Sequence, residues 1–146
     1  MRARGGGKNK RGYSFLSHTA DIKARVWGET LPQCAEEAII AMQAAMFGGH
    51  LPALRRRGGL RVVRVAPSGG EALLVDLLNA VLAEADARDE VYPEVKVEGG
   101  KRGWRVLLRG GKPARRPRLE VKAATYSALK LERARGRWVA EVVFDV

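Results

Sequence analysis

The sequence predicts a single-domain α+β fold, in which two helices pack on a largely antiparallel β-sheet system. The length of 146 residues fits one domain that can bury a core. Two long segments carry apolar residues at helical spacing, which predicts the helices. The remaining segments are short, rich in strand-forming residues and separated by turns that contain glycine. There is no internal repeat and no sign of a second domain.

The first strands are expected over residues 13–15 and 21–27. In the second of these, Ile22, Ala24 and Val26 alternate with basic residues. This period of two is typical of a strand with one buried and one solvated face.

The first helix is expected to begin after Thr30 and to end at Gly48-Gly49. Thr30 and Gln33 have the spacing of a capping box, in which each side chain binds a free backbone N–H at the helix start. One apolar stripe is predicted to face the sheet: Cys34, Ala38, Met42, Ala45 and Met46.

The second helix is expected to begin at a capping box of Ser68 and Glu71 and to run to about Arg88. Asp76 interrupts its apolar sequence, and we assign this residue to the polar edge of the helix. A broad stripe is predicted to lie on the sheet: Leu73, Leu74, Leu77, Leu78, Val81, Leu82 and Ala85.

The rest of the chain reads as strands joined by turns and loops. Residues 51–59 are predicted to form a loop that contains Arg55, Arg56 and Arg57. The glycine pairs Gly99-Gly100 and Gly110-Gly111 are predicted to be turns. The expected strands cover residues 60–66, 95–98, 104–108, 119–131 (with a break) and 137–144.

Charge is unevenly distributed in this chain of net charge +11. Residues 1–12 are predicted to form a disordered basic leader, and residues 13–146 the folded domain. Residues 101–118 contain eight basic residues and no acid, whereas residues 71–94 contain seven acids and one Arg. A segregated basic surface attracts phosphate backbones or an acidic partner, although a merely solvated face is an equally good interpretation.

Several classes of protein are excluded by simple features. No run of eighteen apolar residues exists, so no membrane span is expected, and no apolar stretch follows the basic leader as a signal peptide requires. The single cysteine, Cys34, permits no internal disulfide and fits a reducing compartment. We therefore expect a cytoplasmic protein in which Cys34 is an inert core residue.

Two carboxylates near opposite ends of the chain are the main candidates for chemistry. Asp21 opens a predicted strand, and Asp145 closes one beside the terminal carboxylate of Val146. If the sheet brings them together, three oxygen groups converge as a hard cation requires, and the cation offsets their mutual repulsion. Such a cluster suits calcium or magnesium, and the residues alone do not identify the ion. The cofactor that we expect is a divalent metal ion, with calcium preferred and magnesium or manganese as alternatives. The plainer interpretations are a turn residue for Asp21 and a solvated terminus for Asp145.

Four segments in this order carry a resemblance to a known family. They are His18-Thr19-Ala20-Asp21, the apolar residues 73–79, Lys122-Ala123-Ala124-Thr125-Tyr126, and Phe144-Asp145-Val146. Their order and spacing resemble those of the archeases, from about Tyr13 to Val146.

The resemblance implies a function and roles for single residues. Archeases are non-catalytic accessory proteins of the RtcB-type GTP-dependent RNA ligase, whose guanylylation and multiple turnover they promote in tRNA splicing and RNA repair. The resemblance implies that Asp21 and Asp145 are metal ligands, with the Val146 carboxylate as a third. It also implies that Lys122 acts in activating the ligase. His18 is more simply a turn residue that orients Asp21.

The sequence departs from the family at two positions and leaves another function open. Ser127 stands where archeases usually have His, and Gly111 stands where they usually have Glu. The alternative function is a basic RNA-binding or chaperone-like modulator of an RNA-modifying enzyme. A stand-alone nuclease lacks a third acid and a general base. RNA contact is expected through the basic residues Lys101, Arg102, Arg105, Arg109, Lys112, Arg115, Arg116 and Arg118.

Overall fold

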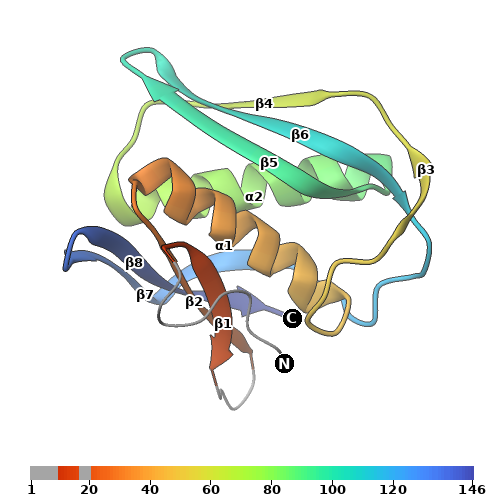
Figure 1. Ribbon diagram of the computed structural model, residues 1–146, viewed down its shortest axis with the longest axis horizontal. Helices are drawn as coiled ribbons and strands as arrows, with labels where there is room; N and C mark the ends of the chain where they lie inside the picture. The colour runs from red at the N-terminus through yellow and green to blue at the C-terminus, as the bar shows by residue number, and fades with distance from the viewer. Residues whose placement is uncertain (1–9, 17–20) are drawn as a thin grey trace.

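The protein has three layers, because both helices lie between two antiparallel sheets (Figure 1). The computed structural model describes residues 10–16 and 21–146, and of residues 126–129 it describes only the backbone. The predicted α+β class with two helices is confirmed. In the described part of the chain, neither helix is long and apolar enough to cross a membrane.

The first sheet has the strand order β1-β2-β8-β7, and all its neighbours are antiparallel. Because β8 pairs with β2, the end of the chain lies beside a strand near its beginning. This topology positions the candidate site described below. The strands are β1 (Gly12–Leu16), β2 (Ile22–Gly28), β7 (Ala123–Ala134) and β8 (Arg137–Asp145).

The second sheet is built around β6, which pairs with three other strands. Two of them, β3 and β4, pair with successive stretches of β6, at residues 111–113 and 104–108. The predicted loop over residues 51–59 was therefore wrong, because it contains β3. The strands are β3 (Leu54–Arg57), β4 (Arg61–Val65), β5 (Val91–Gly100) and β6 (Gly103–Pro113).

Gly110 and Gly111 lie inside β6, so the prediction that they form a turn was wrong. A Cβ atom on Gly110 would lie 1.9 Å from the carbonyl oxygen of Val91. A Cβ atom on Gly111 would lie 2.0 Å from the carbonyl oxygen of Arg56. These glycines therefore allow the backbones of β5 and β3 to approach β6, a use of glycine that sequence patterns do not distinguish from a turn.

The first helix, α1 (Leu31–Met46), is buried on all sides. Its predicted start is confirmed: the Thr30 hydroxyl accepts a hydrogen bond from the Gln33 backbone at 3.2 Å, and the Gln33 side chain accepts one from the Glu29 backbone at 3.0 Å. The prediction of a single buried stripe was too narrow. The helix contacts β2 in one sheet and β5 in the other, so opposite faces are both covered.

The second helix, α2 (Gly70–Arg88), buries the predicted apolar stripe against β7 and β4. The predicted capping box of Ser68 and Glu71 was wrong. The N-cap is Gly69, which offers no side chain, and the Ser68 hydroxyl lies 3.4 Å from a carboxylate oxygen of Asp76 instead. The chain leaves the helix at Asp89, which has a left-handed backbone with φ of 53°.

The remaining predicted strands exist but differ in length. β5 begins four residues before the predicted strand 95–98, and its last residues are the pair Gly99-Gly100, just before the hairpin turn. The break predicted within residues 119–131 corresponds to an irregular pairing of β7 with β8 between Thr125 and Lys130. Pairing with a neighbouring strand therefore includes residues whose local sequence does not by itself favour a strand.

A cluster of charges joins the three layers. Arg11, directly before β1, donates from Nε to Glu37 at 2.6 Å and from Nη2 to Glu36 at 2.8 Å. Both acids lie on α1, and the second oxygen of Glu36 accepts a hydrogen bond from the backbone of Val97 in β5 at 2.9 Å. The folded part of the chain therefore includes Arg11, which the sequence pattern places in the leader. Residues 1–9 lie outside the described residues.

Candidate functional site at the end of the first sheet

The pairing of the first sheet places Asp21 and Asp145 next to each other. Ile22 is paired with Phe144, so the preceding Asp21 lies opposite the following Asp145. Residues directly opposite each other on antiparallel strands project to the same face of the sheet. The Phe144 side chain is fully buried on the helix side, whereas Asp145 is exposed. The two carboxylates therefore belong to the outer face, at the end of the sheet.

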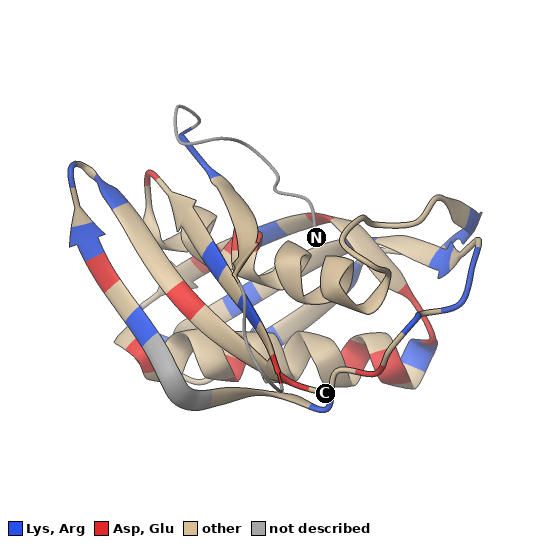
Figure 2. Ribbon diagram, turned by 90° about the horizontal axis from the view of Figure 1, so that it is seen from below, with Lys and Arg blue, Asp and Glu red and all other residues tan. Residues whose placement is uncertain are grey.

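Lys122 lies at the same sheet end, on the other side of β8. Ala123 is paired with Asp145, and the Lys122 backbone N–H donates to the Asp145 carbonyl oxygen at 2.7 Å. Lys122 is exposed, and Figure 2 shows acidic and basic segments close to each other near the C-terminus. The sheet thus collects two acids and a cation from three segments that are distant in sequence.

These groups remain accessible to a partner. Asp145 and Lys122 are exposed, Asp21 is half-buried, and Val146 is 37% exposed. Beneath them lie Phe144 and residues packed with it in the core, so the strand ends have a rigid base. An exposed charged group on a fixed backbone suits recognition of another molecule.

The donor set at this end fits a hard cation but does not fill a coordination shell. Asp21 and Asp145 supply only oxygen donors, which calcium and magnesium prefer. Among residues 10–16 and 21–146, no three His, Cys, Asp or Glu side chains gather closely enough to hold a metal ion. A cation held by the two carboxylates would therefore take its other ligands from a chain-terminal or backbone oxygen, water or a partner.

Asn79 is a supporting residue to which the sequence pattern assigned no role. From α2, its amide oxygen accepts a hydrogen bond from the Ala124 backbone at 2.9 Å, and its amide nitrogen lies 3.4 Å from the Ala124 carbonyl oxygen. The side chain thus satisfies both backbone groups of a residue two positions after Lys122. The sequence feature that could have indicated this role is the amide residue at the end of the apolar segment 73–79.

The structure describes only some of the other candidates. His18 lies outside the described residues, as do the side chains of Tyr126 and Ser127. Asp76 is exposed on α2, as expected for the polar edge of the helix. Cys34 is fully buried, and burial followed by the charge of Glu37 raises the pKa of its thiol to about 12. This agrees with an inert core cysteine.

Three of the eight basic residues of segment 101–118 make contacts within the protein. The eight residues follow the length of β6 and the loop after it, and part of them serve the fold. Arg105 binds Glu98 at 2.6 Å, and Lys112 donates to the carbonyl oxygen of Arg88. Arg115 donates to the Phe47 carbonyl oxygen at 2.9 Å and lies over the Phe47 ring. RNA contact through the residues of this segment stays a prediction.

Comparison with known proteins shows the family of this chain. The model of the archease protein family matches residues 13–146. The chain is 34% identical to the archease of Methanosarcina mazei over 92% of this chain and 95% of that one. It is 36% identical to the archease of Methanopyrus kandleri over 90% of this chain and 96% of that one.

Solved structures share the fold. A protein of Methanobacterium thermoautotrophicum superposes with a TM-score of 0.70 at 23% identity, over 92% of this chain and 98% of that one. An archease of Thermotoga maritima, described as a possible chaperone, superposes with a TM-score of 0.64 at 24% identity, over 90% of this chain and 94% of that one. The family match over the whole described domain and the identity to the two curated relatives show that this chain belongs to the archease family.

Proposed function

We propose that this chain is a non-catalytic accessory protein of an RtcB-type GTP-dependent RNA ligase, in tRNA splicing or RNA repair. It would promote guanylylation of the ligase and its multiple turnover. The observation that carries the proposal is that Asp21, Asp145 and Lys122 all lie at one exposed end of the same sheet in a member of the archease family.

The two carboxylates have a positioning role in this proposal. Asp21 and Asp145, with the Val146 carboxylate as third ligand, would hold a divalent ion, preferably calcium, with magnesium or manganese as alternatives. Such an ion supplies positive charge that stabilises phosphate oxygens. Because the rest of its shell would be open, oxygens of the ligase or of its nucleotide would fit there.

Lys122 has an electrostatic role. Its ammonium group carries a mobile point charge on a long stem, and its backbone is fixed by the bond to Asp145 and, two residues on, by Asn79. It would donate a hydrogen bond to a phosphate oxygen or to the ligase surface. Placement and charge stabilisation are enough to accelerate phosphoryl-type transfer, so this chain needs no nucleophile of its own.

The test measures guanylylation and multiple-turnover RNA joining by the ligase of the same organism, with and without this protein. The native protein should stimulate both steps, whereas Asp145→Asn and Lys122→Ala should lose most of the stimulation. Glu132→Gln is the matched control, because this exposed carboxylate lies on β7, paired with Val139, at the opposite end of the same sheet.

Two results would contradict the proposal. Full stimulation by Asp145→Asn would show that the sheet end is not used. Absence of stimulation by the native protein would reject the ligase role and leave an RNA-binding or chaperone-like modulator as the leading interpretation.

A further inference from the structure

The second sheet has an uncovered outer face. Both helices lie on its inner side, where α1 contacts β5 and α2 contacts β4. Figure 1 shows no helix or strand of the described part of the chain on the outer side of β4, β6 and β5. This face lies on the side of the molecule away from the first sheet, and the proposed ligase role uses none of its residues.

The strand register places three aliphatic side chains next to each other on this face. Val106 and Leu108 are fully buried on the helix side, so Leu107 between them faces outward. Val62 of β4 is paired with Leu107 and therefore shares its face. Leu60 lies two residues before Val62 and belongs to the same side. We call these three residues, Leu60, Val62 and Leu107, the apolar centre of the face.

The apolar centre is accessible to solvent. Val62 is 44% exposed and Leu60 is 41% exposed, which are the two largest exposed fractions among the large hydrophobic residues that the structure describes. Between them, Arg61 is paired with the buried Leu108 and binds Glu90 through two hydrogen bonds of 3.0 Å. This strand thus turns an arginine inward and two aliphatic residues outward. Neighbouring apolar side chains that are exposed in this way are typical of a contact site for another protein.

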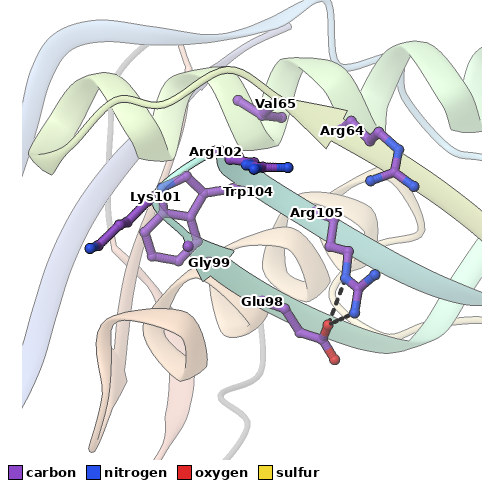
Figure 3. A pocket seen from close by; sticks show the side chains of 10 residues that line it. Arg64, Val65, Glu98, Gly99, Lys101, Arg102, Trp104 and Arg105 are labelled. Carbon is purple, nitrogen blue, oxygen red and sulfur yellow. Dashed lines mark hydrogen bonds and ion pairs between the residues drawn. The ribbon is translucent and has the colours of Figure 1, made fainter.

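Basic side chains surround the apolar centre. Arg64 and Arg105 are paired on adjacent strands, and Arg105 is bound to Glu98 at 2.6 Å (Figure 3). Like charges at opposite positions destabilise an antiparallel pair, and Glu98 offsets only one of the two. Lys96 of β5 is paired with Leu107 on the other side. The charged residues of the face are the basic Arg57, Arg64, Lys96, Arg105 and Arg109, with the acids Glu94 and Glu98.

The combination of an apolar centre with an excess of positive charge selects a class of partner. A second copy of this chain would bring the same positive excess to the contact, and each copy has a net charge of +11. RNA would satisfy the basic residues, but it would leave the aliphatic side chains without a counterpart. Bases stack on aromatic rings, and none of the residues described on this face is aromatic. An acidic protein segment that also carries aliphatic residues complements both features.

We propose that the outer face of the second sheet is a docking surface for an acidic segment of a partner protein. The segment packs aliphatic side chains on the apolar centre and places carboxylates beside Arg64 and Arg109. The surface is independent of the proposed function, because the two helices separate it from the sheet that carries Asp21 and Asp145.

Two synthetic peptides test the docking surface. The probe is a fluorescein-labelled helical peptide of Leu, Glu and Ala, with Leu along one face and Glu beside it. The reference peptide has the same composition in an order that distributes Leu around the helix. Fluorescence anisotropy should show that the native protein binds the probe about fivefold or more tightly than the reference, because only the probe buries its apolar side chains while its charges are paired.

Variants of the face separate the apolar from the electrostatic contribution. Leu60→Thr should raise Kd for the probe about fivefold or more, as loss of a contact at the centre of an interface does. The matched control is Leu16→Thr, which changes a 37% exposed leucine of β1 and should alter Kd by about twofold or less. Arg64→Gln should reduce the dependence of Kd on salt, whereas Arg116→Gln, at an exposed position in the loop after β6, should not.

Four results would overturn the docking surface. Equal binding of the two peptides would show that charge alone attracts them, and absence of binding would show that the face does not recognise this chemistry. Tighter binding of an oligouridylate of the same charge would assign the face to RNA. A dimer in sedimentation equilibrium that Leu60→Thr dissociates would assign it to a second copy. Asp145→Asn should leave peptide affinity unchanged, so failure here and failure of the ligase role are distinguishable.

Discussion

At the scale of single residues, two side-chain amides attach the helices to the sheets. Asn79 of α2 binds both backbone groups of Ala124, and Gln43 of α1 does the same for Tyr92, at 2.6 Å to its N–H and 2.9 Å to its carbonyl oxygen. An amide has both a donor and an acceptor, so it replaces a missing strand partner. Neither role was visible in the sequence, because a polar residue within a helix gives no indication of its distant partner.

Asn79→Ala should destabilise the protein by about 1–3 kcal/mol, because the backbone of the buried Ala124 loses this partner. Since Ala124 follows closely after Lys122, we also expect weaker stimulation of the ligase. Urea unfolding measures the first effect. Asp76→Ala, on the same helix and exposed, serves as the control and should change stability little. Equal stability of Asn79→Ala and the native protein would show that the amide is not needed.

The lowered pKa of Glu90 predicts that the free energy of unfolding depends on pH. Hydrogen bonds from Arg61, and from the Tyr92 hydroxyl, lower the pKa of this carboxyl group. A lowered folded-state pKa gives stability that is complete above the ordinary pKa, and is lost as pH falls toward the folded value. Glu90→Gln should therefore flatten the loss of stability on acidification.

The measurement for Glu90 is the urea midpoint as a function of pH. Glu71→Gln changes an exposed carboxylate that forms no ion pair with a described residue, so it should keep the acid-dependent loss of the native protein. The same steep loss in Glu90→Gln would contradict the assignment.

At the scale of elements, local sequence patterns predicted both helices and most strands. They did not predict the positions at which neighbouring strands approach each other. The Thr30 cap and the apolar period of α2 are local, so they were predicted correctly. Gly110-Gly111 was misread, because a turn and a close approach of strands both demand glycine. The strand β3, with its Arg-rich sequence, exists through pairing with β6 rather than through its own propensity.

Gly110→Ala should destabilise the protein strongly, because a methyl group 1.9 Å from the Val91 carbonyl oxygen forces two strands apart. We expect a loss of about 3 kcal/mol, at the upper end of overpacking effects. Gly100→Ala is the matched control, since nothing lies within 4 Å of its added methyl group. Thermal unfolding compares the two variants. Similar melting temperatures would show that β5 and β6 move apart without cost.

At the scale of the whole molecule, the three-layer arrangement explains what the sequence could not show. Helical periodicity indicates which face of α1 is apolar, but it does not reveal that a second sheet covers the opposite face. The same limit applies to the candidate site. Asp21, Asp145 and Lys122 meet through the pairing of β2, β8 and β7, which no local pattern specifies. They were selected through the resemblance of the surrounding motifs, and metal binding there stays a prediction.

Arg11 should stabilise the packing of the three layers against each other. Arg11→Ala would remove the guanidinium group that is bound to Glu36 and Glu37, whose side chains are 7% and 0% exposed. Loss of one partner from a buried charge cluster costs about 3 kcal/mol. Lys10→Ala, which removes an 81% exposed side chain paired with Glu29, should cost far less. Guanidinium chloride unfolding measures both, and equal effects would contradict this role.

The place of β8 in the first sheet has a consequence for how the protein is made. The strand β8 separates β2 from β7, so neither has this neighbour until residues 137–145 have been synthesised. While the ribosome still holds this segment, β2 and β7 present unpaired edges, which are sites of aggregation. The same residues that complete the sheet carry Asp145, so the exposed acidic end forms only in molecules whose first sheet is complete.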